Sequence, residues 1–152
     1  MTDTTQDQPF FSLDKIYVKD ISLEIPHAPH IFMERDNPQI EVQLESQAKS
    51  LDEGVFEVEV VSTVTTRVGE KVMFLIEAKQ AGIFQIRNVP LDELEPVLAV
   101  TCPNILFPYL REVVSDISVR AGFAPVVLNP LNFEALYQQR KQQEAAAAGT
   151  TH

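Results

Sequence analysis

The 152-residue chain contains a single cysteine, Cys102, so it lacks an internal disulfide framework. A chain of this kind suits a reducing compartment, and we expect a cytoplasmic protein. Basic residues are scarce too: 12 Lys and Arg stand against 22 Asp and Glu, and the net charge is −10. This balance argues against nucleic-acid binding and favours a basic partner. No segment resembles a signal peptide and no apolar run approaches about 18 residues, so we expect no direct membrane insertion.

Signatures of the common enzyme classes are missing as well. The sequence has no G-x-G-x-x-G, P-loop or H-E-x-x-H motif. Cys102 has no histidine near it in sequence, which favours a packed thiol over a nucleophile, although a thiol enzyme stays an alternative. His27 and His30 lie between prolines and, with one distant cysteine, fall short of four zinc ligands. We therefore predict no catalytic residue, no metal site, no cofactor and no enzymatic activity.

What the sequence does contain is a set of four strand patterns. Apolar and polar residues alternate, or return after a turn at Gly69, in the segments DISLEI (20–25), IEVQLE (40–45), FEVEVVSTVTT (56–66) and VMFLIEAK (72–79). These patterns predict half-buried antiparallel strands. We expect one domain over residues 1–152, with a flexible leader at 1–10 and a flexible tail at 144–152.

Two helix patterns follow the strands. The first begins near Leu91 and ends at Gly122, and it carries more apolar residues than one buried stripe needs. Pro103 and Pro108 each remove a backbone donor, so we expect a break near residues 102–104 and a bend at Pro108. A shorter helix follows Asn132, the expected N-cap. The predicted fold is α+β: a four-stranded antiparallel sheet, a long proline-interrupted helix and a shorter C-terminal helix.

Strand parity also predicts that one face of the sheet is acidic. The outward positions are Asp20, Glu24, Glu41, Glu45, Glu57, Glu59 and Glu77. Leu75 shares this parity and would place an apolar side chain among the carboxylates. The pattern by itself fits either an ordinary solvated sheet face or an interface.

Three separated blocks of the sequence resemble the SecB family of bacterial protein-export chaperones. They are YVKDISLEIPHAPHIF (17–32), GIFQI (82–86) and CPNILFPYLRE (102–112), and the likeness continues less sharply through LNPLNFEALY (128–137). The resemblance implies a cytosolic homotetramer, a dimer of dimers with the long helices at its centre. It also implies a chaperone that holds unfolded precursor proteins without ATP and passes them to SecA, the translocation motor.

The resemblance further implies roles for particular residues. The basic, zinc-carrying tail of SecA would bind Asp20, Glu24, Leu75 and Glu77. Client chains would bind a groove near Phe32, Ile40, Val42, Leu44, Phe133 and Leu136. Copies of the chain would meet through Leu106, Tyr109, Leu110, Val113 and Ile117. The alternative is a homo-oligomeric adaptor or scaffold that binds a folded basic partner through the acidic face and has no client groove.

Overall fold

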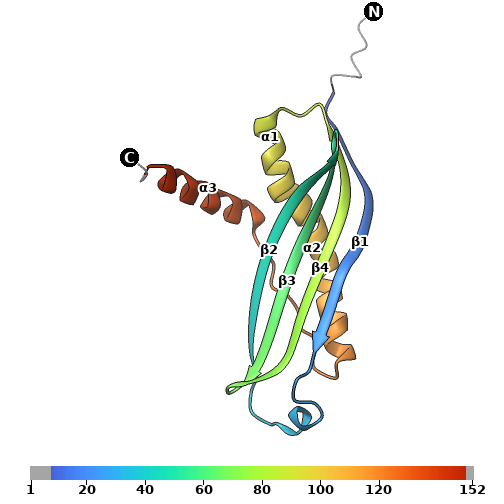
Figure 1. Ribbon diagram of the computed structural model, residues 1–152, viewed down its shortest axis with the longest axis vertical. Coiled ribbons are helices and arrows are strands. Elements are labelled where there is room, and N and C mark those ends of the chain that lie inside the picture. The colour runs from blue at the N-terminus through green and yellow to red at the C-terminus, as the bar shows by residue number, and fades with distance from the viewer. Residues whose placement is uncertain (1–7, 150–152) are drawn as a thin grey trace, which may run out of the picture.

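The computed structural model describes residues 8–149 and arranges them as one antiparallel sheet backed by helices (Figure 1). The elements are β1 (Phe10–Glu24), the 3-10 turn η2 (His30–Met33), β2 (Gln39–Asp52), β3 (Val55–Val68), β4 (Lys71–Arg87), α1 (Leu91–Pro96), the π-helical segment η3 (Val97–Thr101), α2 (Cys102–Arg120) and α3 (Phe133–Gly149). The predicted α+β arrangement of sheet, long helix and C-terminal helix is confirmed.

The strand order in the sheet is β1-β4-β3-β2, so β1 and β2 form its two edges. β1 is much longer than the predicted segment, since it begins at Phe10. It also contains two bulges, at Asp14 and Lys19. Each bulge inserts one unpaired residue and reverses the inward and outward parity of the residues that precede it. The first half of β1 therefore has no regular alternation in the sequence.

The chain stays helical from Leu91 to Arg120. In place of the break expected near residues 102–104, the helix has the π-helical segment η3, about one turn earlier. The backbone N–H of Cys102 donates to the carbonyl of Val97, five residues back, as in a π-helix. Pro103, which has no N–H to donate, directly follows this widened turn. The helix then continues through Pro108 without a change of element.

The core lies between the sheet and α2, which packs against β3 and β4. Cys102, Leu106, Leu110 and Val114 recur every four residues along α2 and are all 0 % exposed. Gly82 of β4 allows the close approach, because a Cβ at this position would lie 3.0 Å from the Leu106 side chain. Burying each large apolar side chain contributes about 1.5–3 kcal/mol, so this row of contacts is a main source of stability.

Among the described residues, one helical stretch, Leu91–Arg120, is long and apolar enough by length and composition to cross a membrane. This finding corrects the expectation that no segment approaches that length. The apolar side of α2 packs on the sheet, however, and core helices of water-soluble proteins pass the same test. The helix is therefore weak support for a membrane span.

Residues 122–132 connect α2 to α3 and lead the chain back along α2. The buried Ser118 hydroxyl accepts the Val126 N–H at 2.9 Å, and the Arg111 side chain donates to the Leu128 carbonyl at 2.9 Å. Asn132 accepts the Ala135 N–H at 2.9 Å, which confirms it as the helix cap. α3 then projects from the body and runs to Gly149, so the described part of the expected flexible tail is helical. Residues 1–7 of the expected leader and 150–152 of the tail lie outside the described residues.

The buried thiol of Cys102 generates a prediction about stability at high pH. Burial raises its pKa from 9.0 to about 12, so above pH 9 the thiol ionises in the unfolded chain but stays neutral in the folded one. Its contribution to stability is complete below pH 9 and is lost as the pH rises toward 12. Relative to Cys102→Ala, the unfolding free energy of the parent should fall by about 1.4 kcal/mol per pH unit in this window.

Urea unfolding of both proteins at pH 8 and pH 10 measures this effect. Taking the difference between parent and variant removes the contribution of all other titrating groups, which the two proteins share. A difference that stays constant between the two pH values would show that the thiol ionises as easily in the folded chain as in the unfolded one.

Candidate functional site

The helices leave part of the inner face of the edge strand β2 open. Ile40, Val42 and Leu44 pair with inner-face residues of β3, so they lie on the same side of the sheet as α2. α2 packs over β3 and β4, and consequently Ile40 is 53 % and Val42 41 % exposed. The backbone of β2 also has no neighbouring strand on its outer edge within the described residues. This part of the fold therefore offers apolar side chains beside unpaired strand backbone.

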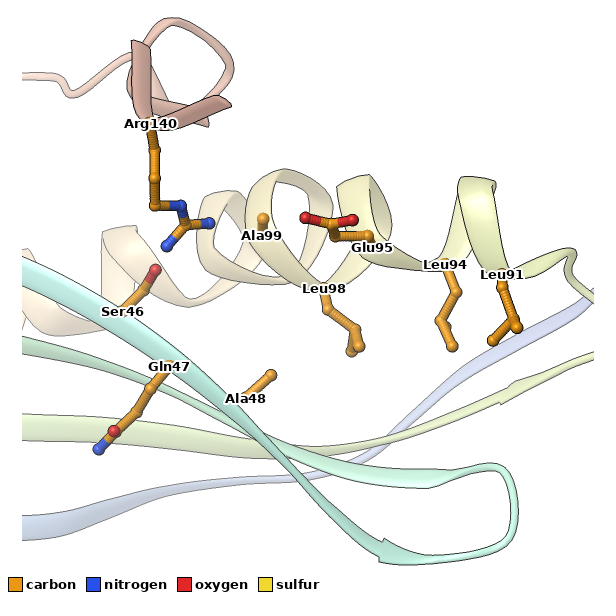
Figure 2. A pocket seen from close by; sticks show the side chains of 9 residues that line it. All are labelled: Ser46, Gln47, Ala48, Leu91, Leu94, Glu95, Leu98, Ala99 and Arg140. Carbon is orange, nitrogen blue, oxygen red and sulfur yellow. The ribbon is translucent and has the colours of Figure 1, made fainter. Parts of the chain in front are cut away.

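Two adjoining cavities extend this open face. The first, of about 340 Å³, lies between β2 and the start of the long helix (Figure 2) and is lined by Ser46, Gln47, Ala48, Leu91, Leu94, Glu95, Leu98, Ala99 and Arg140. The second, of about 360 Å³, lies between β2 and α3 and is lined by Leu44, Glu45, Ser46, Ala99, Leu131, Phe133, Leu136, Tyr137 and Arg140. Ser46, Ala99 and Arg140 belong to both. We call the two cavities and the open residues Ile40, Val42 and Leu44 the β2 groove.

The structure brings five of the six predicted client residues to this groove. Leu44, Phe133 and Leu136 line the second cavity, and Phe133 forms part of its floor because it is only 4 % exposed. Ile40 and Val42 continue the same inner face along β2. Client binding by these residues stays a prediction.

The sixth residue, Phe32, lies apart from the cavities at the η2 turn and is 46 % exposed. Its ring stacks on Phe123 at 5.0 Å, and Phe123 stacks on Phe74 at 4.6 Å. Phe74 shares a pairing row with Thr66 and Ile40. Phe32 therefore lies at the far end of an aromatic row that leads toward Ile40, and does not line either cavity.

Sequence reasoning missed the part of the groove wall that α1 and η3 supply, together with Arg140 of α3. Leu91, Leu94 and Leu98 were recognisable as an apolar stripe, and in the structure they point toward Ala48 of β2 (Figure 2). Arg140 carried no sequence signal, because it lies in a polar helix with almost no apolar periodicity. Strand and helix periodicity show which residues share a face, but they do not show which strand the helix leaves uncovered.

The opposite face of the sheet carries the predicted acidic residues as neighbours. The strand register pairs Asp20 with Lys79, Ser22 with Glu77 and Glu24 with Leu75. The same rows continue across β3 to β2, where they end at Glu45, Gln43 and Glu41. Asp20 and Glu24 are exposed, whereas Glu77 and Leu75 are partly buried between neighbouring strands. We call Asp20, Glu24, Glu41, Glu45, Glu77 and the central Leu75 the acidic face.

Glu57 and Glu59 lie on the outward face that strand parity predicted, but they are not part of its open acidic surface. Glu59 is 4 % exposed, and Lys19 forms ion pairs with Glu57 at 2.8 Å and with Glu59 at 3.0 Å. Tyr17 donates a hydrogen bond to Glu57, and Gln47 donates one to Glu59. The hydrogen bonds from Lys19 and Tyr17 hold the pKa of Glu57 below its ordinary value. Lys19 reaches both carboxylates from a bulge, which the sequence pattern did not reveal.

Only some of the residues expected to join copies of the chain have exposed side chains. Leu106 and Leu110 are 0 % exposed because they pack against the chain's own sheet, so their assignment to an interface between copies is wrong. Tyr109 is 49 % exposed, and Val113 and Ile117 are partly exposed. These three residues remain candidates for such an interface.

Within residues 8–149, no group of three or more His, Cys, Asp or Glu side chains is arranged to hold a metal ion. His27 and His30 line a cavity of about 340 Å³ with Glu34 and Lys71, and these last two form an ion pair at 3.6 Å. The only cysteine, Cys102, is the buried first residue of α2 and does not line this cavity.

Comparison with known proteins shows which family this chain resembles. The family model described as preprotein translocase subunit SecB matches residues 4–144. The protein-export protein SecB of Nitrosomonas europaea is 62 % identical over 93 % of this chain and 89 % of its own length. That of Methylobacillus flagellatus is 57 % identical over 97 % of this chain and 94 % of its own.

A solved structure confirms the fold at much lower sequence identity. The SecB-like chaperone of Mycobacterium tuberculosis, in complex with a ChAD peptide from an antitoxin, aligns with a TM-score of 0.66 at 18 % identity. The alignment covers 80 % of this chain and 90 % of that one. At this identity the likeness concerns the arrangement of sheet and helices. The family model and the curated relatives, which span nearly the whole sequence, show that the chain belongs to the SecB family.

Proposed function

We propose that this protein is a cytoplasmic, ATP-independent chaperone that binds unfolded or slowly folding precursor proteins in the β2 groove, keeps them competent for translocation and delivers them to SecA. Family membership supports a chaperone role in protein export. The observation that carries the proposal is the combination of an open apolar groove with an unpaired edge strand. The solved SecB-like chaperone carries a bound peptide, which supports peptide binding here as well.

The groove suits an unfolded chain for a physical reason. An extended segment could pair with the edge of β2 through its backbone, which is common to all sequences. Its alternate side chains would enter the cavities beside Leu44, Leu94 and Leu98, and each would contribute about 1.5–3 kcal/mol on burial. Binding of this kind selects for apolar, extended segments and for little else. Loose selectivity is what a chaperone with many clients requires.

The acidic face supplies a second surface, for SecA. Its carboxylates surround the partly buried Leu75, so a basic segment with one apolar side chain would fit it. We assign the basic, zinc-carrying tail of SecA to Asp20, Glu24, Leu75 and Glu77. The zinc in this assignment belongs to the partner.

We also propose that the working form is a homotetramer, a dimer of dimers. Tyr109, Val119 and Val127 are large apolar residues that remain 49 %, 52 % and 63 % exposed on or beside α2, which supports a contact between copies there. Several grooves in one particle would then bind successive segments of the same client and raise its avidity. No nucleic acid and no membrane insertion enters this function.

A homo-oligomeric adaptor or scaffold is the second candidate, and the acidic face favours it because this surface can bind a folded basic partner without any groove. Reduced, unfolded polypeptides separate the two functions. A chaperone binds them in competition with one another, whereas an adaptor ignores them and binds only its folded partner. Native mass determination with and without an unfolded precursor gives both the stoichiometry and the oligomeric state.

The groove generates the first functional prediction. Replacing Val42 and Leu44 together with Gln should weaken the binding of unfolded chains at least about tenfold, because two apolar contacts are lost. The matched control is Leu51→Gln, a residue of the same strand that is 47 % exposed and lies outside both cavities. Affinity for a reduced, unfolded precursor is measured by calorimetry, alongside SecA binding.

SecA binding should be unchanged in both the double variant and Leu51→Gln. Leu44 packs partly against the core, so the double substitution can lower the stability of the fold. Thermal unfolding of each variant must therefore accompany the affinity measurement. If the double variant is unstable, the single variant Val42→Gln keeps the test valid. Normal client binding by a stably folded Val42→Gln, Leu44→Gln protein would show that clients bind elsewhere.

The acidic face generates a second prediction. Reversing both Glu24 and Glu77 to Lys should abolish SecA binding, because the summed field of the carboxylates attracts the basic tail. Leu75→Gln should weaken binding through loss of apolar contact and should preserve its salt dependence. Client binding should change little in either protein, because the substituted side chains lie on the face of the sheet opposite the groove.

Calorimetry at low and at physiological salt measures these effects, because the Debye length shortens to about 8 Å at physiological ionic strength. The charge-reversal control is Glu53→Lys, an acidic residue in the β2–β3 turn and outside the acidic face. Undiminished SecA binding by the Glu24→Lys, Glu77→Lys protein would refute the assignment of this surface.

A further inference from the structure

Lys79 is a cation that lies within the acidic face. It is on the outward side of β4, and the strand register places it between Asp20 of β1 and Val61 of β3. Glu77 precedes it on the same side of the same strand, about 7 Å away along the backbone. The surface proposed for a basic partner therefore contains a charge of the partner's own sign.

The sheet fixes the position of Lys79. β4 is an interior strand, and at this residue its backbone is paired on both sides. Lys79 is partly buried, and the neighbouring Val61 is only 5 % exposed. A lysine in such a position lays its apolar stem over the sheet and keeps its ammonium group in water. The charge of Lys79 is therefore held over this part of the face.

No internal ion pair neutralises this charge. Within residues 8–149, Lys79 forms no ion pair with a carboxylate. Lys19 differs, because it pairs with Glu57 at 2.8 Å and with Glu59 at 3.0 Å. Asp20 is the partner of Lys79 in the strand register, but its side chain is exposed to water. Lys79 can therefore act directly on the charges of a bound segment.

Lys79 makes the charge of the acidic face uneven. The pairing rows across this face are Glu24–Leu75–Thr65–Glu41, Ser22–Glu77–Thr63–Gln43 and Asp20–Lys79–Val61–Glu45. The first two rows contain carboxylates and no cation, whereas the third has Lys79 between its two carboxylates. Arg67 lies on β3 beyond the first row, so it borders the face and does not divide it. A Lys or Arg of the partner is thus attracted near Leu75 and repelled above Lys79.

We propose that Lys79 makes the acidic face selective for basic segments that carry a neutral or acidic side chain among their cations, and against unbroken runs of Lys and Arg. The inference rests on the proposed function, because it assumes that the basic tail of SecA binds this face. A carboxylate of the partner above Lys79 gains an ion pair, whereas an ammonium or guanidinium group there is repelled. This single inversion of the preferred charge fixes the register of the bound segment.

A charge scan of the SecA tail tests this selectivity with the full-length protein. Each position of the tail outside its zinc ligands is changed in turn to Glu and to Lys, so the scan itself finds the position above Lys79. Calorimetry at low salt gives the Kd of each tail for the parent, Lys79→Gln, Lys79→Glu and Lys79→Arg. The matched control is Lys49→Gln, which replaces an exposed lysine on the same side of the sheet, in the row of Glu57 and outside the acidic face.

At the position above Lys79, the parent should bind the Glu tail about threefold more tightly than the Lys tail, and elsewhere on the acidic face it should favour Lys. Lys79→Gln should abolish this inversion and Lys79→Glu should reverse it, while Lys79→Arg and Lys49→Gln should keep it. If no position favours Glu in the parent, or if the inversion persists in Lys79→Gln, the role of Lys79 is overturned, while binding of the unmodified tail leaves the proposed function intact. If the unmodified tail does not bind the parent, the SecA surface itself is refuted, and this inference with it.

Discussion

The packing of α2 on β3 and β4 is the contact on which both the stability and the open surface of this protein depend. The helix approaches closely over Gly82 and buries an unbroken row from Cys102 to Val114. One helix covers about two strands of such a sheet, because helices pack about 10 Å wide and strands lie about 4.8 Å apart. The same contact that builds the core therefore leaves the inner face of β2 without a cover.

β2 contributes to both surfaces through the alternation of its side chains. Ile40, Val42 and Leu44 face inward to the groove, while Glu41 and Glu45 face outward to the acidic face. The sheet itself separates the two surfaces, so a client and a basic partner can bind without competing for the same side chains. On the outer face, the bulge at Lys19 pairs with Glu57 and Glu59 and thereby confines the open acidic surface to the other half of the sheet.

Side-chain periodicity was sufficient to predict the strands, the helix starts and the outward parity of Asp20, Glu24, Leu75 and Glu77. It failed where the backbone departs from regular repeats. The bulges at Asp14 and Lys19 hid half of β1, and the π-helical turn at Val97–Thr101 replaced the break expected at Pro103. The resemblance placed Leu106 and Leu110 at an interface, and the helix pattern could not correct this, because it shows an apolar surplus but not which residues the sheet covers.

The excess of acidic residues has a consequence for an open apolar groove. An exposed surface such as that formed by Ile40, Val42 and the cavities promotes indiscriminate association between copies and with other folded proteins. A net charge of −10 opposes such encounters at long range, while its effect on a contact already formed is screened within about 8 Å. Folded acidic proteins are thus kept apart, whereas a flexible chain can place a few neutral, apolar residues in the groove and keep its other charges at a distance. Overall charge and local apolarity together favour unfolded partners over folded ones.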